Sequence, residues 1–249
     1  MNGEGVGIRL DKREGTISDM FNEIAPRYDL INHLLSLNID ILWRRKVISF
    51  LKRQQEGRKA TSPFKVIDIA CGTGDSTVML YKNHIAATGV DIAERMLNVA
   101  RAKNGRLHRG ETPPPQYHNA SAERLPFKDE EFAAAVICFG VRNFSDRSGS
   151  LKEIYRVIER GGNIAILEFA EPVNRVTRSL YSLYLKHLVP LIGGMISGKR
   201  SAYRYLSLSI ENFPKYERFC KELSEAGFKE INYKALTGGI ALLYTGKKS

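Results

Sequence analysis

The sequence predicts an α/β fold in which helices cover both faces of a doubly wound, seven-stranded and mostly parallel β-sheet. Three observations lead to this fold class. The apolar, β-branched run at residues 65–70 is typical of a strand buried on both faces. Four further strand-like runs, separated by helical patterns and loops, continue to residue 168, which indicates a parallel sheet. Two last strand-like runs lie on either side of Thr237-Gly238-Gly239 and predict one antiparallel strand at the end of the sheet.

Each element follows from the spacing of the apolar residues and from the residues that interrupt it. Apolar positions three and four apart predict a helix from Ser18, interrupted at Pro26, and a second helix around residues 42–51. The helix expected at residues 148–158 should end at Gly161-Gly162, because helices commonly end at glycine. The remaining elements are expected in the order helix 75–82, strand 85–90, helix 93–103, strand 116–119, strand 133–139, helix 148–158, strand 163–168, strand 228–235 and strand 240–244.

The chain of 249 residues is long enough for one sizeable α/β domain with additions. We expect a flexible N-terminus at residues 1–17 and a single domain at residues 18–249. Within that domain, residues 18–60 are expected to form an N-terminal helical cap. Residues 171–212 are rich in Leu, Tyr and basic side chains, and we expect them to form a helical lid with turns at Pro190 and Gly193-Gly194.

The composition is that of a globular protein with a strong positive charge. Hydrophobic residues make up 43% of the chain, and the formal net charge is +11. This charge suggests nucleic acid or the anionic face of a membrane as a partner, and a solvated basic surface without a specific partner is the plain alternative. No apolar run approaches the roughly 20 residues that cross a bilayer, and the first residues lack the apolar core of a signal peptide. We therefore expect a cytoplasmic location.

The cysteines and histidines do not suggest a metal site. Cys71, Cys138 and Cys220 are an odd number for a disulfide framework and show no metal-type spacing, and the five histidines form no recognisable ligand motif. We predict no bound metal and a reducing compartment.

The loop after the first buried strand predicts a nucleoside site. Gly72 and Gly74 allow a tight turn and the close approach of a ligand, and Asp91 follows Gly72 by 19 positions, at the end of the next strand. That spacing is typical of a βαβ unit in which an acidic residue at the end of the second strand binds the ribose hydroxyls of a nucleoside. The loop has no third glycine and no lysine, and Asp75 would repel a pyrophosphate. A nucleoside without phosphates but with a cationic portion fits better, and S-adenosylmethionine has this chemistry.

Two further strand ends are expected at the same edge of the sheet. The small residues Ser121-Ala122 would let an adenine lie against the backbone, although a plain strand-to-helix loop would also explain them. Arg142 and Asn143 place a cation and an amide after the fourth strand, and the plain alternative for Arg142 is a surface salt bridge. The predicted cofactor site is formed by Cys71, Gly72, Thr73, Gly74, Asp91, Ile92, Ser121, Ala122 and Cys138.

Motifs from residue 20 to the C-terminus resemble the ubiquinone/menaquinone biosynthesis C-methyltransferase (UbiE/MenG) family. The glycine loop alone would indicate only a class I S-adenosylmethionine methyltransferase. The combination of Phe139-Gly-Val-Arg-Asn143, Leu167-Glu-Phe169 and Tyr203-Arg-Tyr-Leu206 is far more specific. The other matching segments are Met20–Asp29, Trp43-Arg-Arg, Asp68–Asp75, Ala122–Phe127, Gly161-Gly162, Ser209-Ile210 and Leu236–Ile240.

This resemblance implies a Rossmann-like class I methyltransferase that methylates a ring carbon of a polyprenylated quinol. The implied reaction is the conversion of demethylmenaquinol to menaquinol, the last step of menaquinone biosynthesis, and the benzoquinol step of ubiquinone biosynthesis stays open beside it. The family's cofactor positions correspond here to Thr73, Asp91 and Ser121-Ala122. Ser121 departs from the Asn that relatives more often carry, which puts a side-chain amide contact in doubt.

The chemistry assigns roles to a few residues. An activated methyl group needs no covalent nucleophile or metal, so positioning should supply most of the catalysis. Arg142 is the candidate to stabilise a developing phenolate, and Asn143 the candidate to orient Arg142 or a water. Tyr28, with Asp29, is expected to cover the cofactor. The general base stays open between a water held by Arg142 and His187, for which a structural role is the stronger reading.

The expected partner is a membrane-resident polyprenyl quinol. Residues 176–196 would then form a lid over the ring and tail, with basic residues facing anionic head groups in a peripheral membrane contact, and an ordinary packed cap is the alternative. A homodimer is also expected, and nucleic acid is not. Two competing functions remain: a nucleic-acid methyltransferase, suggested by the charge, and a non-catalytic scaffold that binds S-adenosylmethionine in a quinone-biosynthesis complex.

Overall fold

The computed structural model describes residues 11–58, 63–105, 107 and 112–249. Within these residues, seven strands form one sheet in the order β3-β2-β1-β4-β5-β7-β6. β1 to β5 run parallel, whereas β7 runs antiparallel to both β5 and β6. The strands are β1 (Lys65–Ile69), β2 (Ala86–Asp91), β3 (Gln116–Asn119), β4 (Phe132–Cys138), β5 (Ile158–Phe169), β6 (Lys229–Leu236) and β7 (Ala241–Lys247). The predicted doubly wound, seven-stranded sheet is confirmed.

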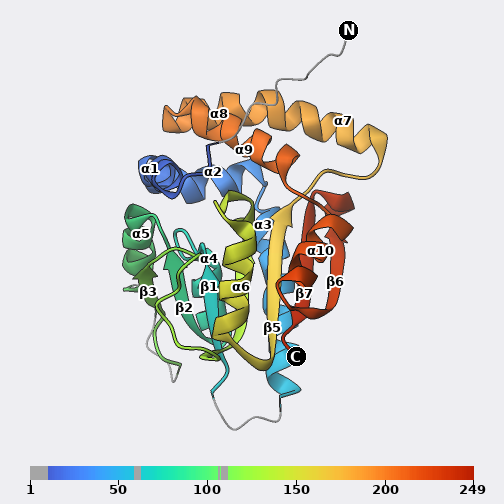
Figure 1. Ribbon diagram of the computed structural model, residues 1–249. Coiled ribbons are helices and arrows are strands. Elements are labelled where there is room, and N and C mark those ends of the chain that lie inside the picture. Colours follow the sequence, from blue (N-terminus) through green and yellow to red (C-terminus); the bar gives the residue numbers. More distant parts are fainter. Residues whose placement is uncertain (1–10, 59–62, 106, 108–111) are drawn as a thin grey trace.

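Helices cover both faces of the sheet (Figure 1). α3 (Ile39–Glu56) and α4 (Asp75–Lys82) pack on one face, where Leu80 shares an apolar cluster with Val66 of β1. α6 (Arg147–Val157) and α10 (Glu217–Glu225) pack on the other face, where Ile154 shares a cluster with Ile67. α5 (Glu94–Asn104) packs beside β2 and β3. Neighbouring residues of β1 thus serve opposite faces, as the apolar run at residues 65–70 predicted.

A third layer lies over the carboxyl ends of the parallel strands (Figure 1). The two helical segments of this layer, far apart in sequence, share an apolar cluster that includes Ile31, Met96, Leu185 and Tyr203. The first segment is α1 (Glu14–Ile24), η1 (Ala25–Arg27) and α2 (Tyr28–Leu35); the second is α7 (Arg175–Leu183), the π-helical turn η3 (Tyr184–Leu188), α8 (Val189–Ser197) and α9 (Arg200–Asn212). None of the helices in the described part of the chain is long and apolar enough to cross a membrane.

The expected turns at Pro190 and Gly193-Gly194 are wrong. The chain stays helical from Arg175 to Ser197 and turns only at Gly198, which has a φ of 75°. At Val189, the backbone N–H donates to the carbonyl of Tyr184, five residues earlier, which defines the wider turn η3. A wider turn before proline keeps the preceding carbonyl away from the proline ring, so the helix tolerates Pro190.

The expected helix end at Gly161-Gly162 is also wrong. Helix α6 ends at Val157, and strand β5 begins at the next residue, so both glycines lie inside a strand. Gly161 has a φ of 76°, and a Cβ on Gly162 would lie 2.7 Å from the carbonyl oxygen of Ala133. The pairing of β4 with β5 shifts register close to this point, so the glycines allow an irregular strand to approach its neighbour.

Two helices, α1 and α10, differ from expectation, and the expected flexible N-terminus is only partly described. Residues 1–10 of the segment expected to be flexible lie outside the described residues, and α1 begins at Glu14 rather than Ser18. Helix α10 was not predicted, because only Phe219 and Leu223 mark its buried face among charged residues.

Candidate active site

Two adjoining cavities lie at the carboxyl edge of the sheet, where the strand order reverses between β1 and β4 and the loops diverge. The first, which we name the loop cavity, lies along the glycine loop. Eight of the nine predicted cofactor residues line it: Cys71, Gly72, Thr73, Asp91, Ile92, Ser121, Ala122 and Cys138.

Gly74, the ninth residue, shapes the loop from behind. It precedes the first residue of α4 with a φ of 81°, and a Cβ there would lie 2.8 Å from the Tyr117 hydroxyl. Gly74 is therefore required by the backbone and by close packing, while the cavity itself is lined by its neighbours.

Asp91 holds the glycine loop and keeps acceptor capacity for a ligand. Its Oδ2 accepts the backbone N–H of Gly72 at 2.8 Å, and its Oδ1 accepts that of Ala93 at 2.8 Å. Burial raises the pKa of Asp91. A carboxylate has about four acceptor positions, so these two bonds leave capacity for the hydroxyls of a ribose.

The charge of the loop cavity suits a cation. Among the described residues, four acidic residues line it, against one basic residue, Arg44; the acids are Glu14, Asp75, Asp91 and Glu123. A pyrophosphate would face unpaired repulsion here, whereas the sulfonium of S-adenosylmethionine would be attracted. The residues present therefore fit this cofactor, as the absence of a P-loop lysine predicted.

The N-terminal cap is tied directly to the glycine loop. Asp29 of α2 accepts a hydrogen bond from the Thr73 hydroxyl and lies 2.7 Å from Lys103 Nζ. The same lysine lies 2.5 Å from Asp75. Tyr28 lines both cavities, and burial raises the pKa of its phenol. The sequence placed Tyr28 and Asp29 over the cofactor, but it did not indicate Lys103, which comes from α5.

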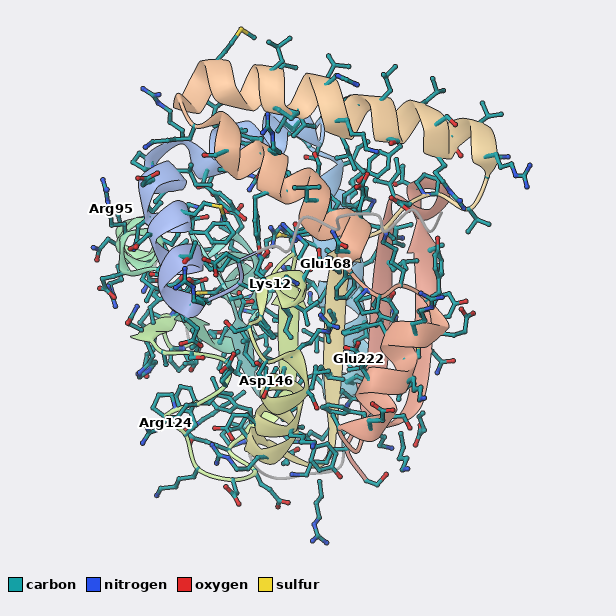
Figure 2. The ribbon with its side chains drawn as sticks, turned by 45° about the horizontal axis from the view of Figure 1, so that its top comes forward. Lys12, Arg95, Arg124, Asp146, Glu168 and Glu222 are labelled. Atoms are coloured by element: carbon teal, nitrogen blue, oxygen red, sulfur yellow. The ribbon has the colours of Figure 1, made fainter. Side chains whose placement is uncertain are left out.

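Arg142 is held by a buried acid, Glu168, which the sequence placed in the motif Leu167-Glu-Phe169 without a role. Its side chain is 5% exposed, and its Nη1 lies 2.7 Å from Oε1 of Glu168, which is fully buried at the lid end of β5 (Figure 2). Nε of Arg142 also donates to the Ser209 hydroxyl of α9 at 3.2 Å. The sequence did carry a signal for this pairing: Glu168 is a single acid directly after the apolar run at residues 164–167. A lone charge at the end of a buried strand needs a partner.

Asn143 contacts the lid rather than Arg142. Its Oδ1 accepts a hydrogen bond from the Tyr205 hydroxyl of α9 at 3.2 Å. Among the described residues, no hydrogen bond joins the side chains of Arg142 and Asn143, and Glu168 and Ser209 orient the guanidinium instead. Arg142 and Asn143, which lie in η2 (Val141–Asn143), are thus attached to the same lid helix.

His187 is not placed to act as a base. Its side chain is exposed, and it lines neither cavity. This position does not support the alternative in which His187 is the general base.

Arg44 lines both cavities, although its motif received no role from the sequence. Its guanidinium donates to the Ser76 hydroxyl and lies 5.2 Å from the centre of the Phe139 ring. Its Nε is buried, lies 3.7 Å from Asp40, and has no hydrogen-bond partner among the described residues. A buried cation with spare donor capacity at the boundary of two cavities is suited to an anionic group of a ligand.

The second cavity, which we name the lid cavity, lies between the cap and the lid and measures about 640 Å³. Apolar and aromatic side chains form most of its wall, among them Phe21, Trp43, Phe169, Leu185, Val189 and Leu206. Arg142 also lines it, and Leu34, Leu37 and Leu180 line it where they are themselves exposed. In the part of the chain that the structure describes, no group of three or more His, Cys, Asp or Glu side chains could hold a metal ion.

Solved structures of methyltransferases share this fold. Magnesium protoporphyrin IX methyltransferase from Synechocystis PCC 6803, solved with bound SAM, aligns with a TM-score of 0.65 and 15% identity over 97% of this chain and 99% of its own. A SAM-dependent methyltransferase from Thermotoga maritima aligns with a TM-score of 0.60 and 18% identity over 94% of this chain. At these identities the likeness shows the fold, which is that of class I methyltransferases.

Sequence relatives are more specific. Demethylmenaquinone methyltransferase of Chlorobaculum parvum is 40% identical over 238 residues, 95% of this chain and 94% of its own length. Ubiquinone/menaquinone biosynthesis C-methyltransferase UbiE of Geobacter sulfurreducens is 38% identical over 244 residues, 96% of this chain and 91% of its own. Residues 9–248 match the family described as the ubiE/COQ5 methyltransferase family. The chain therefore belongs to the ubiE/COQ5 methyltransferase family.

Proposed function

We infer that this protein transfers a methyl group from S-adenosylmethionine to a ring carbon of demethylmenaquinol and so forms menaquinol, the last step of menaquinone biosynthesis. The relatives that share 95–96% of its length carry the names of this activity. The observation that carries the inference is the pair of adjoining cavities. The loop cavity is acidic and suits a cationic nucleoside, the lid cavity is apolar and suits a prenylated ring, and Phe21, Tyr28, Arg44 and Phe139 line both.

The chain supplies position and charge for this reaction. Bound S-adenosylmethionine contributes a methyl group on a positively charged sulfur, which is already activated toward an electron-rich carbon. A carbon–carbon bond would form, the carbon–sulfur bond would break with its electron pair staying on sulfur, and the ring carbon would lose its proton to a water beside Arg142. Arg142 lines the lid cavity beside the place where the ring would lie, so its charge would favour a phenolate there. Glu168 and Ser209 fix the direction of the guanidinium, which lowers the cost of reorganisation during the reaction.

The size of the lid cavity supports a substrate with an isoprenoid tail. About 640 Å³ is in the usual range for a ligand pocket, enough for a bicyclic ring and the first units of a prenyl chain. Leu34, Leu37 and Leu180 are both exposed and cavity-lining, and they offer an apolar passage for the rest of the tail.

A benzoquinol is a second candidate substrate. The name of the Geobacter relative covers both ubiquinone and menaquinone biosynthesis, and the wall of the lid cavity is mostly apolar. A largely apolar wall discriminates weakly between rings that differ by a few carbon atoms.

The test is the transfer of a labelled methyl group from S-adenosylmethionine to demethylmenaquinol carrying a short prenyl tail, kept reduced with dithionite. We expect the label in the organic extract. A benzoquinol of the same tail length tests the second candidate, and transfer RNA tests the nucleic-acid alternative. Label that enters RNA and not the quinol would support the competing function, and S-adenosylmethionine binding without transfer to any of the three would support the scaffold.

A further inference from the structure

The outer face of the long lid helix carries an apolar stripe. We define the outer stripe as Val176, Leu180, Leu183, Leu188, Leu191 and Met195, whose exposed fractions run from 45% to 69%. The steps between them are four, three, five, three and four residues. Residues three or four apart lie on the same face of an α-helix, so only the step of five would move the row to another face. That step from Leu183 to Leu188 spans the wider turn η3. The π-helical turn therefore keeps both halves of the stripe on one side.

Packing among the described residues does not explain this stripe. The opposite side of the same helix carries Tyr181, Tyr184, Leu185 and Val189, which pack against the cap and the lid cavity. Figure 2 shows side chains of α7 and α8 that point away from the body of the molecule, and each of the six stripe residues is exposed. A row of six exposed apolar side chains is more than the scattered surface leucines that a monomer usually shows.

The outer stripe is continuous with the opening of the lid cavity. Leu180 belongs both to the stripe and to the cavity wall. Leu34 of α2 and Leu37 in the turn after it line the same cavity and are 47% and 76% exposed. α2 is attached to the lid through the Tyr184 hydroxyl, which donates to the carbonyl of Leu35. An apolar surface therefore leads from the stripe into the cavity.

The charge around the stripe is one-sided. Residues 175–210 contain six Lys and Arg residues and no Asp or Glu. Two of these, Lys186 and Lys199, pair with Glu211 and Glu23 from outside that range, at 2.9 Å and 3.0 Å. Arg175 and Arg204 are exposed. An amphipathic helix with exposed apolar residues and basic flanks matches the boundary between acyl chains and anionic head groups.

We propose that the outer stripe docks this protein on an anionic membrane surface, with the helix 175–197 lying in the plane of the head groups. The lid cavity then opens toward the acyl chains, and a polyprenyl quinol enters it without crossing water. The entrance of substrate by this path rests on the proposed function, whereas the docking itself does not. A second copy of the chain would cover the apolar residues, but it would bring the basic flanks of two lids together.

The test is co-sedimentation of the full chain with vesicles of phosphatidylcholine that contain either no phosphatidylglycerol or 30% phosphatidylglycerol. We expect binding to the anionic vesicles, weakened by salt. Leu183→Ser/Leu191→Ser removes apolar surface without changing charge, and neither residue lines a cavity. We expect this variant to bind anionic vesicles at least about tenfold more weakly than the wild type. The matched control Arg160→Ala/Lys221→Ala removes two exposed charges far from the stripe and should bind like the wild type.

A second readout separates docking from catalysis. With short-tailed quinol in detergent, the stripe variant should keep wild-type methyl transfer, and with long-tailed quinol in anionic vesicles it should lose most of it. Equal vesicle binding by wild type and stripe variant, or no binding by either, overturns the proposal. Conversion of a dimer to a monomer by the stripe variant, with vesicle binding unchanged, would assign the stripe to a second copy. Vesicle binding without methyl transfer in detergent would overturn the proposed function and leave the docking surface intact.

Discussion

Replacing Arg142 by Ala would remove the guanidinium that we assign to the developing phenolate, and it would also leave Glu168 without its counterion. Glu168 is fully buried, and its Oε1 lies 2.7 Å from Arg142 Nη1. Removing one partner of a buried ion pair costs about 3–5 kcal/mol of unfolding free energy. In a domain of this size, each kcal/mol lowers Tm by about 2–4 °C, so Arg142→Ala should lower Tm by roughly 6–20 °C.

A second variant separates this loss of stability from the loss of chemistry. Arg142→Met/Glu168→Gln removes both charges and leaves the side-chain volumes similar, and such a replacement of a buried pair is often close to neutral for stability. We expect its Tm to lie within about 5 °C of the wild type. Its rate of methyl transfer should still fall about 10²–10³-fold, the usual cost of removing one group that stabilises a developing oxyanion.

The assay is single-turnover transfer of a labelled methyl group to a reduced, short-tailed quinol, with cofactor affinity measured by calorimetry. Arg142 lines the lid cavity and not the loop cavity, so the Kd for S-adenosylmethionine should stay within about threefold of the wild type. A folded double variant that keeps the wild-type rate would refute the role given to Arg142. A folded double variant that no longer binds S-adenosylmethionine would place Arg142 in the cofactor site instead.

Three further predictions concern the glycine loop and its surroundings. Burial raises the pKa of Asp68 to about 7, so the folded state holds a proton that the unfolded state releases near pH 4, and stability is lost as pH rises toward 7. In urea unfolding, the unfolding free energy of Asp68→Asn relative to that of the wild type should rise by about 2.5 kcal/mol between pH 5 and pH 8. A difference that stays constant over this range would contradict the shifted pKa. Gly74→Ala should lower the unfolding free energy by about 2 kcal/mol or more, since φ is 81° and the Cβ would lie 2.8 Å from the Tyr117 hydroxyl, whereas Gly15→Ala in an open part of α1 should not lower it. Asp91→Asn should weaken S-adenosylmethionine binding by about tenfold or more in calorimetry, because the amide cannot accept the Gly72 and Ala93 N–H groups and two hydroxyls together; unchanged affinity would remove Asp91 from the ribose site.

The sequence predicted the parts of this fold that depend on local pattern. The run at residues 65–70, the glycine turn and Asp91 lie in adjacent elements of one βαβ unit, so short-range spacing determines where they meet. Helix 75–82 and strand 116–119 were predicted with the bounds that the structure has.

Features that depart from the usual local rules, or that depend on neighbours distant in sequence, were missed. Proline and paired glycines ordinarily end helices, and nothing local indicates that η3 widens the turn ahead of Pro190. Gly161 and Gly162 lie in β5 because β4 passes close to them, which their own segment does not reveal.

The site was predicted by residue type better than by contact. Arg142 and Asn143 lie at the expected edge, yet their partners Glu168, Ser209 and Tyr205 come from β5 and α9. A hydrogen bond between segments 26 to 67 residues apart leaves little trace in one sequence. For the same reason Lys103 was not predicted and Arg44 was given no role, since each contacts residues of another element.

The central claim is that a ring carbon of a reduced quinol accepts the methyl group. The most direct measurement uses S-adenosylmethionine carrying a ¹³C methyl group, with demethylmenaquinone of short tail supplied in its reduced and in its oxidised form, and carbon NMR of the extracted product. We predict a ¹³C methyl signal bonded to a ring carbon from the reduced form, and essentially no product from the oxidised form. A methyl signal bonded to oxygen, or equal transfer to the oxidised quinone, would contradict the account.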